Sequence, residues 1–273
     1  MKISIIVNYS KENAKSCSDE IVRILSEKNC ILGSYEYDYD GKYPKEVYDC
    51  DVIIAIGGDG TIIHTAKVAA KKSIKILGVN VGSLGFTASM ECSEFLYLDK
   101  LLAGNYTTEN RMMIEADIIT KGEIINLTAL NDIVLSGGVS QIIEYKISLG
   151  GDNIYKYRAD GFIISTPTGS TAYALSAGGP VIEPSMKCIE YTPICPHSLF
   201  NRSVIFSEDT VVRAWISKKN SEDVFLSADG GKNIKLGLKD EIIFKKLNYQ
   251  ADFIKFDNKN FYDILNRKII TIQ

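Results

Sequence analysis

The stretch VIIAIGGDGT, residues 52–61, gives the strongest indication of how this chain folds. Its first half, Val52–Ile56, is a short apolar run rich in isoleucine and valine, which is typical of a strand buried on both faces. Its second half places glycines around Asp59, and a segment of helical character follows from Thr61 to Lys71. A buried strand that turns through glycines into a helix predicts a parallel α/β sheet, in which ligands bind at the carboxyl ends of the strands.

The segments on either side of this stretch repeat the same alternation of strand and helix. Strands are predicted at Ile3–Val7, Ser34–Asp38 and Ile74–Val79, and helices at Lys11–Lys28 and Phe95–Leu102. Short connections between such elements favour a mostly parallel sheet covered by helices. We therefore expect a Rossmann-like α/β domain over residues 1–105. A predicted helix at Asn258–Lys268 would pack back on it, so residues 257–273 return to this domain.

The pattern changes after residue 106. Short runs rich in Ile, Val and Tyr follow one another, separated by turn signals such as Lys121-Gly122 and Gly150-Gly151. One helix, expected at Ser170–Ala177, interrupts them. Residues 106–256 are therefore predicted to form a β-rich, antiparallel, sandwich-like domain.

Composition and charge exclude several classes of protein. The 273 residues carry 31 Lys and Arg against 34 Asp and Glu, a net charge of -3, which argues against a nucleic-acid-binding protein. No apolar run approaches the roughly 20 residues that span a bilayer, and Met1–Asn8 is expected to be a buried strand rather than a signal peptide. The six cysteines are scattered without a zinc-binding spacing, so we expect them all to be reduced in a cytoplasmic protein.

The glycines at residues 57, 58 and 60 are suited to binding phosphate. Glycine lets the backbone approach an anion closely, and the first amides of the following helix are free to donate to it. The loop is not a Walker A motif, because no Gly-Lys-Ser or Gly-Lys-Thr follows, and it does not fit G-x-G-x-x-G. His64 lies one turn into the helix and is within reach of a phosphate, although a packed or solvated histidine is more common there.

Asp59 is the unusual residue of this loop, since a carboxylate repels phosphate. It would be explained by metal binding or by accepting a proton from a nucleophile. An aspartate that only caps the helix or stabilises the turn is an equally good interpretation of the spacing alone.

Three further motifs point to a ligand. Gly78–Phe86 forms a second glycine cluster after the next predicted strand. The stretch 160–173 crowds four hydroxyl side chains around a helix start, more than capping requires, at Thr166, Thr168, Ser170 and Thr171. Asn131-Asp132 interrupts an apolar run, which is costly unless both side chains find partners. Because neighbours on a strand face opposite ways, the pair is expected at a strand end or a bulge.

Taken together, these motifs resemble those of bacterial NAD kinases, over nearly the whole chain. The loop at 57–61 also occurs in diacylglycerol and sphingosine kinases, but its combination with Asp160-Gly161 and the stretch TPTGSTAY at 166–173 is highly specific. The resemblance implies ATP-dependent phosphorylation of the 2′-hydroxyl on the adenosine ribose of NAD, giving NADP. It also implies Mg²⁺ or another divalent cation with ATP, no fixed metal site on the protein, and a homotetramer or homodimer.

The resemblance also assigns roles to individual residues. Asp59 would be the general base beside the reacting hydroxyl. The expected NAD-binding residues are Gly58, Asp59, Gly60, Phe86, Asn131, Asp132, Asp160, Thr168, Thr171, Ala172, Tyr173 and Ser176. The expected phosphate-side residues are Gly57, Gly58, Gly60, Thr61 and His64. Asp132 stands where many members of the family have Glu, and Ser227–Gly231 resembles a late Asp-Gly motif of the family.

Two other classes of protein remain open. A lipid kinase would share the loop at 57–61, but it would also need a basic or amphipathic segment facing the membrane, which the sequence does not show. A sensor that binds NAD or NADP without catalysis would not need a carboxylate at Asp59.

Overall fold

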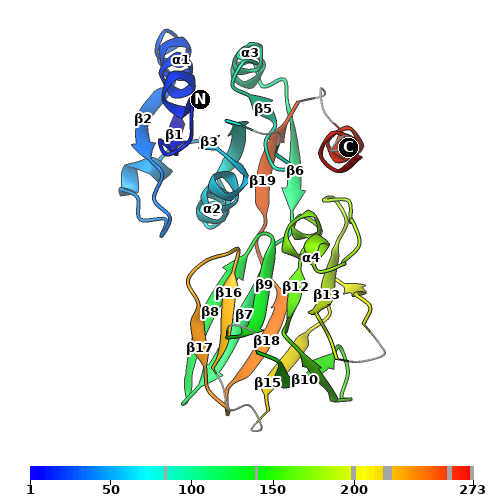
Figure 1. The fold of residues 1–273 in the computed structure, drawn as a ribbon. Coiled ribbons are helices and arrows are strands. Elements are labelled where there is room, and N and C mark those ends of the chain that lie inside the picture. The colour runs from blue at the N-terminus through cyan, green and yellow to red at the C-terminus, as the bar shows by residue number, and fades with distance from the viewer. Residues whose placement is uncertain (83–84, 139–140, 198–200, 218–222, 257–259, 271–273) are drawn as a thin grey trace. The chain divides into compact units, whose positions relative to one another are not determined.

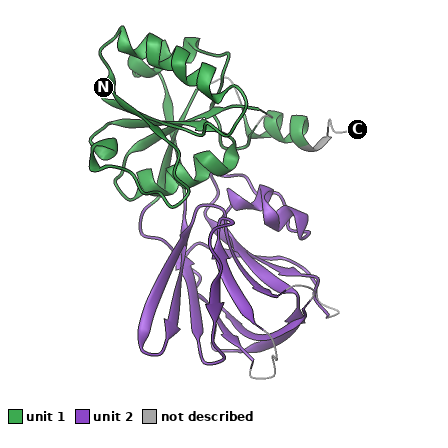
Figure 2. Ribbon diagram, turned by 60° about the vertical axis from the view of Figure 1, so that its left-hand side comes forward, with its two compact units in different colours: residues 1–111, 250–273 green, residues 112–249 purple. Residues whose placement is uncertain are grey.

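The computed structural model describes residues 1–82, 85–138, 141–197, 201–217, 223–256 and 260–270. The chain divides into two compact units (Figure 2), one formed by Met1–Arg111 with Gln250–Gln273 and the other by Met112–Tyr249. Within the described ranges, no helix has the length and apolar character that a membrane span requires.

The first unit, drawn in Figure 1, is built on a seven-stranded sheet with the order β2-β1-β3-β4-β19-β6 and β5 paired with β4. All of its pairings are parallel except that of β6 with β19. This confirms the predicted Rossmann-like, mostly parallel sheet. Its strands are β1 (Ile3–Val7), β2 (Ile31–Glu36), β3 (Val52–Gly57), β4 (Lys75–Asn80), β5 (Met90–Glu91), β6 (Thr107–Arg111) and β19 (Ala251–Lys255).

Helices cover both faces of this sheet. Ile5 and Ile54 belong to a buried cluster with residues of α1 (Ala14–Ser26) and α3 (Leu96–Leu102). The alternate residues Ile6 and Ile53 pack instead with residues of η1 (Lys45–Tyr48) and α2 (Asp59–Ala70). Because side chains of a strand alternate between faces, burial of both faces explains the continuous apolar run at 52–56.

The end of the chain returns to the first unit, as predicted. The helix α5 (Phe261–Leu265) begins at Asn260, whose side chain accepts a hydrogen bond from the Asp263 amide at 2.8 Å, and continues into the π-helical turn η3 (Asn266–Ile270). Residues 257–259, where the predicted helix starts, lie outside the described residues.

The boundary between the units differs in position from the expected residues 105 and 257. Strands β6 and β19 pair with each other from Arg111 and Ala251 to Thr107 and Lys255, so both belong to the α/β sheet. The sequence of β6, TTENR, has no apolar residue that would have assigned it to either domain.

The second unit is a sandwich of two six-stranded antiparallel sheets, which confirms the predicted β-rich domain. Side chains from both sheets meet in one buried cluster, among them Ile118 and Ile147 of one sheet and Ile133 and Ile164 of the other. The first sheet contains, in order, β11 (Tyr155–Ala159), β10 (Ile143–Leu149), β15 (Val212–Ile216), β18 (Glu241–Lys246), β7 (Ile114–Thr120) and β8 (Glu123–Ala129). The second contains β14 (Val204–Ser207), β13 (Cys188–Ile194), β12 (Gly161–Ser165), β9 (Asp132–Gly137), β16 (Val224–Ala228) and β17 (Ile234–Leu236).

The helix expected at Ser170–Ala177 is instead two short turns, η2 (Gly169–Thr171) and α4 (Tyr173–Ser176). Ala172 separates them with φ -101° and ψ -126°, which lies outside the helical region. The predicted helix is therefore interrupted at Ala172.

The expectation that all six cysteines are reduced is wrong for two of them. Cys17 of α1 and Cys92, just after β5, form a disulfide with a Cα–Cα distance of 5.6 Å. They are separated by 75 residues, and only the packing of the first unit brings them together. The cysteines at 30, 50, 188 and 195 are free.

Two buried tyrosines join the sheets of the second unit. The hydroxyl of Tyr145 on β10 lies 2.8 Å from that of Tyr191 on β13, and both residues are almost fully excluded from solvent. Burial raises the pKa of both hydroxyls, so they form a neutral hydrogen-bonded pair inside the core.

Removing one member of this pair leaves the other hydroxyl buried without its partner. We therefore expect Tyr145→Phe and Tyr191→Phe each to lower the free energy of unfolding by about 1–3 kcal/mol. The double variant should lose less than the sum of the two, because no unpaired hydroxyl then remains. Urea unfolding of the three variants and the parent measures this, and strictly additive losses would contradict it.

Candidate active site

The glycine loop lies at the carboxyl end of β3, as the sequence predicted. Gly57 is the last residue of β3, and Asp59 is the first residue of α2. A Cβ on Gly57 would come within 2.6 Å of Thr61, so only glycine fits there.

The hydroxyl of Thr61 accepts a hydrogen bond from Asn8 Nδ2 at 2.8 Å, which ties α2 to the end of β1. Lys11 also reaches the loop, with its Cε 4.0 Å from the position of a Cβ on Gly58.

Asp59 joins the two glycine clusters of the first unit. Its Oδ2 accepts from the Phe86 amide at 3.1 Å, and its Oδ1 accepts from the Thr87 amide at 3.1 Å and the Thr87 hydroxyl at 2.5 Å. A side chain on Gly85 would collide with the carboxylate, which explains the glycine there. The N-cap position of α2 belongs to Gly58. The interpretation of Asp59 as a local helix cap is therefore wrong, since its carboxylate binds a distant segment.

A lysine from the end of the chain completes the surroundings of this carboxylate. Lys268 Nζ of η3 lies 3.3 Å from Asp59 Oδ2 and 4.6 Å from the centre of the Phe86 ring. The two side chains are only 27% and 31% exposed, so solvent screens their charges incompletely. Burial acts to raise the pKa of Asp59, but the Thr87 hydroxyl, the Lys268 ammonium and the two amides outweigh it and hold that pKa below its usual value. Asp59 is thus an ionised acceptor at neutral pH, with a cation beside it.

His64 packs against aromatic side chains. Its Nδ1 lies 3.4 Å from the Tyr39 carbonyl oxygen, and its ring centre is 4.6 Å from that of Tyr39 and 6.4 Å from that of Tyr37. Contact between His64 and a phosphate stays a prediction. In the second glycine cluster, residues 83–84 lie outside the described residues.

In the second unit, Asn131 and Asp132 lie at a strand end, one of the two places expected because neighbours within a strand face opposite ways. Asn131 precedes β9, and Asp132 is the first residue of that strand. The Oδ1 atom of Asn131 is buried and accepts no hydrogen bond from any described residue. Asp132 is itself 5% exposed. The pair therefore presents polar groups at the point where the apolar strand begins.

The turn around Asn131 is shaped by Asp229, which was not among the predicted site residues. The carboxylate of Asp229 accepts hydrogen bonds from the amides of Leu130 at 2.9 Å, Asn131 at 2.8 Å and Asp132 at 3.1 Å. Asp229 and Gly230 both have positive φ, 49° and 66°, which produces a tight turn after β16. The Asp-Gly dipeptide signals that turn in the sequence, but nothing in the sequence shows which amides the carboxylate reaches.

The four hydroxyls of the stretch 160–173 fall into two groups, three that donate hydrogen bonds within the chain and one that has no partner among the described residues. Thr166 Oγ1 donates to the Leu130 carbonyl at 2.5 Å, and Ser170 Oγ donates to the Pro167 carbonyl at 2.8 Å. Thr171 Oγ1 donates to the Thr168 carbonyl at 3.3 Å. Thr168 Oγ1, in contrast, is buried without a hydrogen-bond partner among the described residues. Such an atom is costly unless a ligand or water satisfies it.

The remaining predicted residues lie around the same segment, with one exception. Tyr173, 47% exposed, begins α4 and Ser176 ends it, while Ala172 separates α4 from η2. Asp160 precedes β12, whereas Thr168 follows it, so the two residues lie at opposite ends of this strand. Within this chain, Asp160 therefore does not join the other predicted residues of the second unit.

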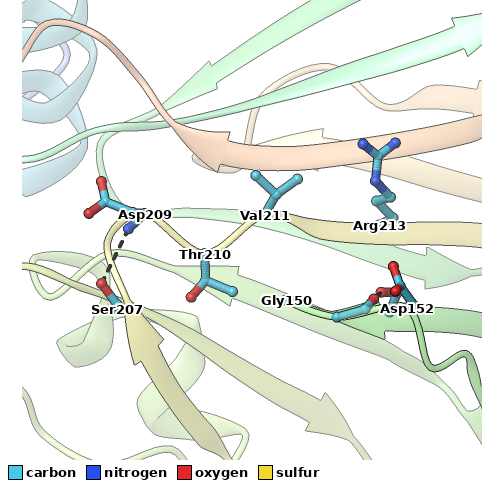
Figure 3. A pocket seen from close by; sticks show the side chains of 9 residues that line it. Gly150, Asp152, Ser207, Asp209, Thr210, Val211 and Arg213 are labelled. Carbon is cyan, nitrogen blue, oxygen red and sulfur yellow. Dashed lines mark hydrogen bonds between the residues drawn. The ribbon is translucent and has the colours of Figure 1, made fainter.

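A surface pocket of about 490 Å³ lies elsewhere on the second unit (Figure 3). Residues of the segments 148–152 and 207–213 line it, including Asp152, Asp209 and Arg213. The guanidinium of Arg213 is engaged with the Glu241 carboxylate at 3.0 Å. No predicted site residue lines this pocket, so we assign no role to it.

Asp229 provides a direct test of how the Asn131 turn is held. Asp229→Ala removes an acceptor from three amides, so we expect the free energy of unfolding to fall by about 1–3 kcal/mol. Hydrogen exchange at the amides of residues 130–132 should become faster, while Asp152→Ala, at an exposed turn of the same unit, should leave it unchanged. Unaltered exchange at 130–132 in Asp229→Ala would show that other contacts hold the turn.

Two family models match the chain. Residues 43–106 match the family model of the ATP-NAD kinase N-terminal domain, and residues 130–256 match that of the C-terminal domain. The chain is 40% identical to an NAD kinase of Thermoanaerobacter sp. (strain X514) over 98% of both chains, and 33% identical to one of Geobacter sulfurreducens over the same share of each.

Two solved structures share the fold. Yeast NADH kinase complexed with NADH has a TM-score of 0.86 at 22% identity, covering all of this chain and 88% of that one. An NAD kinase from Archaeoglobus fulgidus in complex with ATP has a TM-score of 0.77 at 24% identity, covering both chains completely. The extent and identity of the sequence matches show that this chain belongs to the NAD kinase family.

Proposed function

We propose that this chain transfers a phosphoryl group from ATP to the 2′-hydroxyl of the adenosine ribose of NAD, giving NADP. The observation that carries the proposal is Asp59, held ionised at the end of a glycine loop that offers amides to phosphate. Family membership supports the reaction, since relatives that are 40% identical to this chain are named NAD kinases. The archaeal structure that shares the fold is a complex with ATP.

In this proposal the first unit binds phosphate and removes the proton. The backbone at Gly57, Gly58 and Gly60 and the start of α2 at Asp59–Thr61 would bind the donor phosphates, because the amides of a helix start have no partner within the helix. Asp59 would accept the proton of the attacking hydroxyl. The bonds from Phe86 and Thr87 fix its carboxylate before substrate arrives.

The second unit would bind NAD through side chains near the start of β9 and in the segment that follows β12. The Oδ1 atom of Asn131 and the Oγ1 atom of Thr168 are buried and unsatisfied by the described residues, which suits them to donors and acceptors of a nucleoside. Asp132 would contact the ribose. Thr171, Ala172 and Ser176 would line the bases, and the exposed ring of Tyr173 is available for stacking. Asp160 would contact the nicotinamide carboxamide of an NAD shared with a second subunit.

The divalent cation would enter with ATP. Among the described residues, no group of three His, Cys, Asp or Glu side chains is placed to hold a metal ion. We therefore propose Mg²⁺·ATP as the donor substrate, with the cation on the phosphates. We also propose a cytoplasmic location and, as the resemblance implies, an assembly of two or four copies.

Asp59→Asn tests the role of the base. The amide keeps the size of the side chain but loses the charge that accepts the proton, so we expect kcat to fall about 10²–10⁴-fold. The dissociation constant for NAD should change by no more than a few-fold, because the groups assigned to NAD in the second unit are unaltered. NADP formed from NAD and Mg²⁺·ATP, read with an NADP-specific dehydrogenase, gives the rate, and calorimetry gives the binding.

The matched control is Asp99→Asn, which removes an exposed aspartate of α3 in the same unit and should retain full activity. Full turnover in Asp59→Asn would show that Asp59 serves only to hold residues 86–87. Absence of NADP with the parent protein would overturn the proposed reaction itself.

A further inference from the structure

A carboxylate at a phosphate site needs a cation, and the structure places one beside Asp59. Two anions approach each other when the donor phosphate reaches the glycine loop, and their repulsion opposes binding and transfer. Lys268 Nζ, 3.3 Å from Asp59 Oδ2, is the ammonium group that contacts this carboxylate in the described part of the chain. The sequence motifs that point to a ligand do not include Lys268.

Lys268 is held toward Asp59 by its surroundings. Its ammonium lies over the ring of Phe86, 4.6 Å from the centre, and the amide of Phe86 donates to Asp59. The rings of Phe86 and Phe261 are 6.2 Å apart, and Ile264 of the same helix is 5% exposed, so the helix that carries Lys268 is docked. The position of the ammonium therefore results from packing of the C-terminal helix on this loop.

The chemistry of the proposed reaction brings the transferring phosphoryl group to the same place. The ribose oxygen attacks the γ-phosphorus, the new O–P bond forms, and the bond to the β-phosphate oxygen breaks, so that ADP leaves with the electron pair. The proton of the hydroxyl passes to Asp59. An oxygen that gives its proton to Asp59 lies about 2.6–3.2 Å from that carboxylate. The attacked phosphorus lies about 3–3.5 Å beyond this oxygen, within reach of an ammonium that already touches the carboxylate.

We propose that Lys268 is a catalytic residue whose ammonium neutralises Asp59 in the free enzyme and contacts the transferring phosphoryl group during the reaction. This inference rests on the proposed function and adds to it a cation from the end of the chain. It differs from a role in which Lys268 only orients Asp59, because it requires contact with the phosphate itself.

A double-mutant comparison separates these two roles. Lys268→Met removes the charge and keeps an unbranched side chain of similar length, and we expect kcat/KM for ATP to fall about 10–100-fold, as for loss of a hydrogen bond to a charged group. The same substitution in the Asp59→Asn background should lower the residual rate again by about tenfold or more. Lys268→Arg should recover part of the loss, since it restores a cation.

If Lys268 acts only through Asp59, Lys268→Met will have no further effect once Asp59 is replaced, and the proposal is overturned. A rise in KM for NAD without a change in kcat/KM for ATP would also overturn it. Arg267→Met is the matched control, because Arg267 is exposed on the same helical turn, and it should retain the parent rate. Thermal unfolding of each variant separates loss of function from loss of fold.

Binding of inorganic tripolyphosphate, measured by calorimetry without NAD, tests the contact when turnover is too slow to follow. We expect Lys268→Met to weaken this binding at least tenfold in both the parent and the Asp59→Asn background. Equal binding by parent and variant would contradict contact with phosphate. This measurement also separates the proposed contact of Lys268 with phosphate from the proposed formation of NADP, because tripolyphosphate binding can be measured in a protein that forms no NADP.

Discussion

The carboxylate of Asp59 is the interaction on which the first unit's site depends. It receives two amides and a hydroxyl from residues 86–87 and an ammonium from Lys268, so three segments far apart in the chain are fixed by one side chain. Such a group is stable when half-buried because its charge is matched by donors on several sides. The same matching keeps it ionised, which is the state that a proton acceptor requires.

The second unit uses a carboxylate in a comparable way for a different purpose. Asp229 accepts from three consecutive amides and thereby fixes the backbone from which Asn131 projects. These bonds to three consecutive amides shape the turn. Asp59 differs in its place, because its carboxylate lies at the phosphate loop and has the Lys268 ammonium beside it.

The sequence predicted those features that depend on neighbours along the chain. The run at 52–56 and its glycines predicted a buried strand with a site at its carboxyl end, and the adjacent polar residues Asn131 and Asp132 predicted a strand end or a bulge. The features that it could not predict depend on contacts between distant residues. Lys268 follows Asp59 by 209 positions and Asp229 follows Asn131 by 98. No pattern of neighbouring residues indicates either contact. The Cys17–Cys92 pair and the strand TTENR likewise acquire their places only from the packed sheet.

The lowered pKa of Asp59 bears on how the reaction is accelerated. A carboxylate held below its usual pKa is a weak base, so it cannot remove the proton of a ribose hydroxyl before bond formation to phosphorus has made that proton acidic. Asp59 therefore accepts the proton only after the bond to phosphorus has begun to form. Until then the activation barrier must be lowered by positioning of the reactants and by neutralisation of charge, as is general for phosphoryl transfer. At this loop the backbone amides, Lys268 and Lys11, whose side chain reaches Gly58, can supply that neutralisation from the protein. The arrangement that makes Asp59 a poor base in the resting site is thus the one that places a cation where the transferred group must pass.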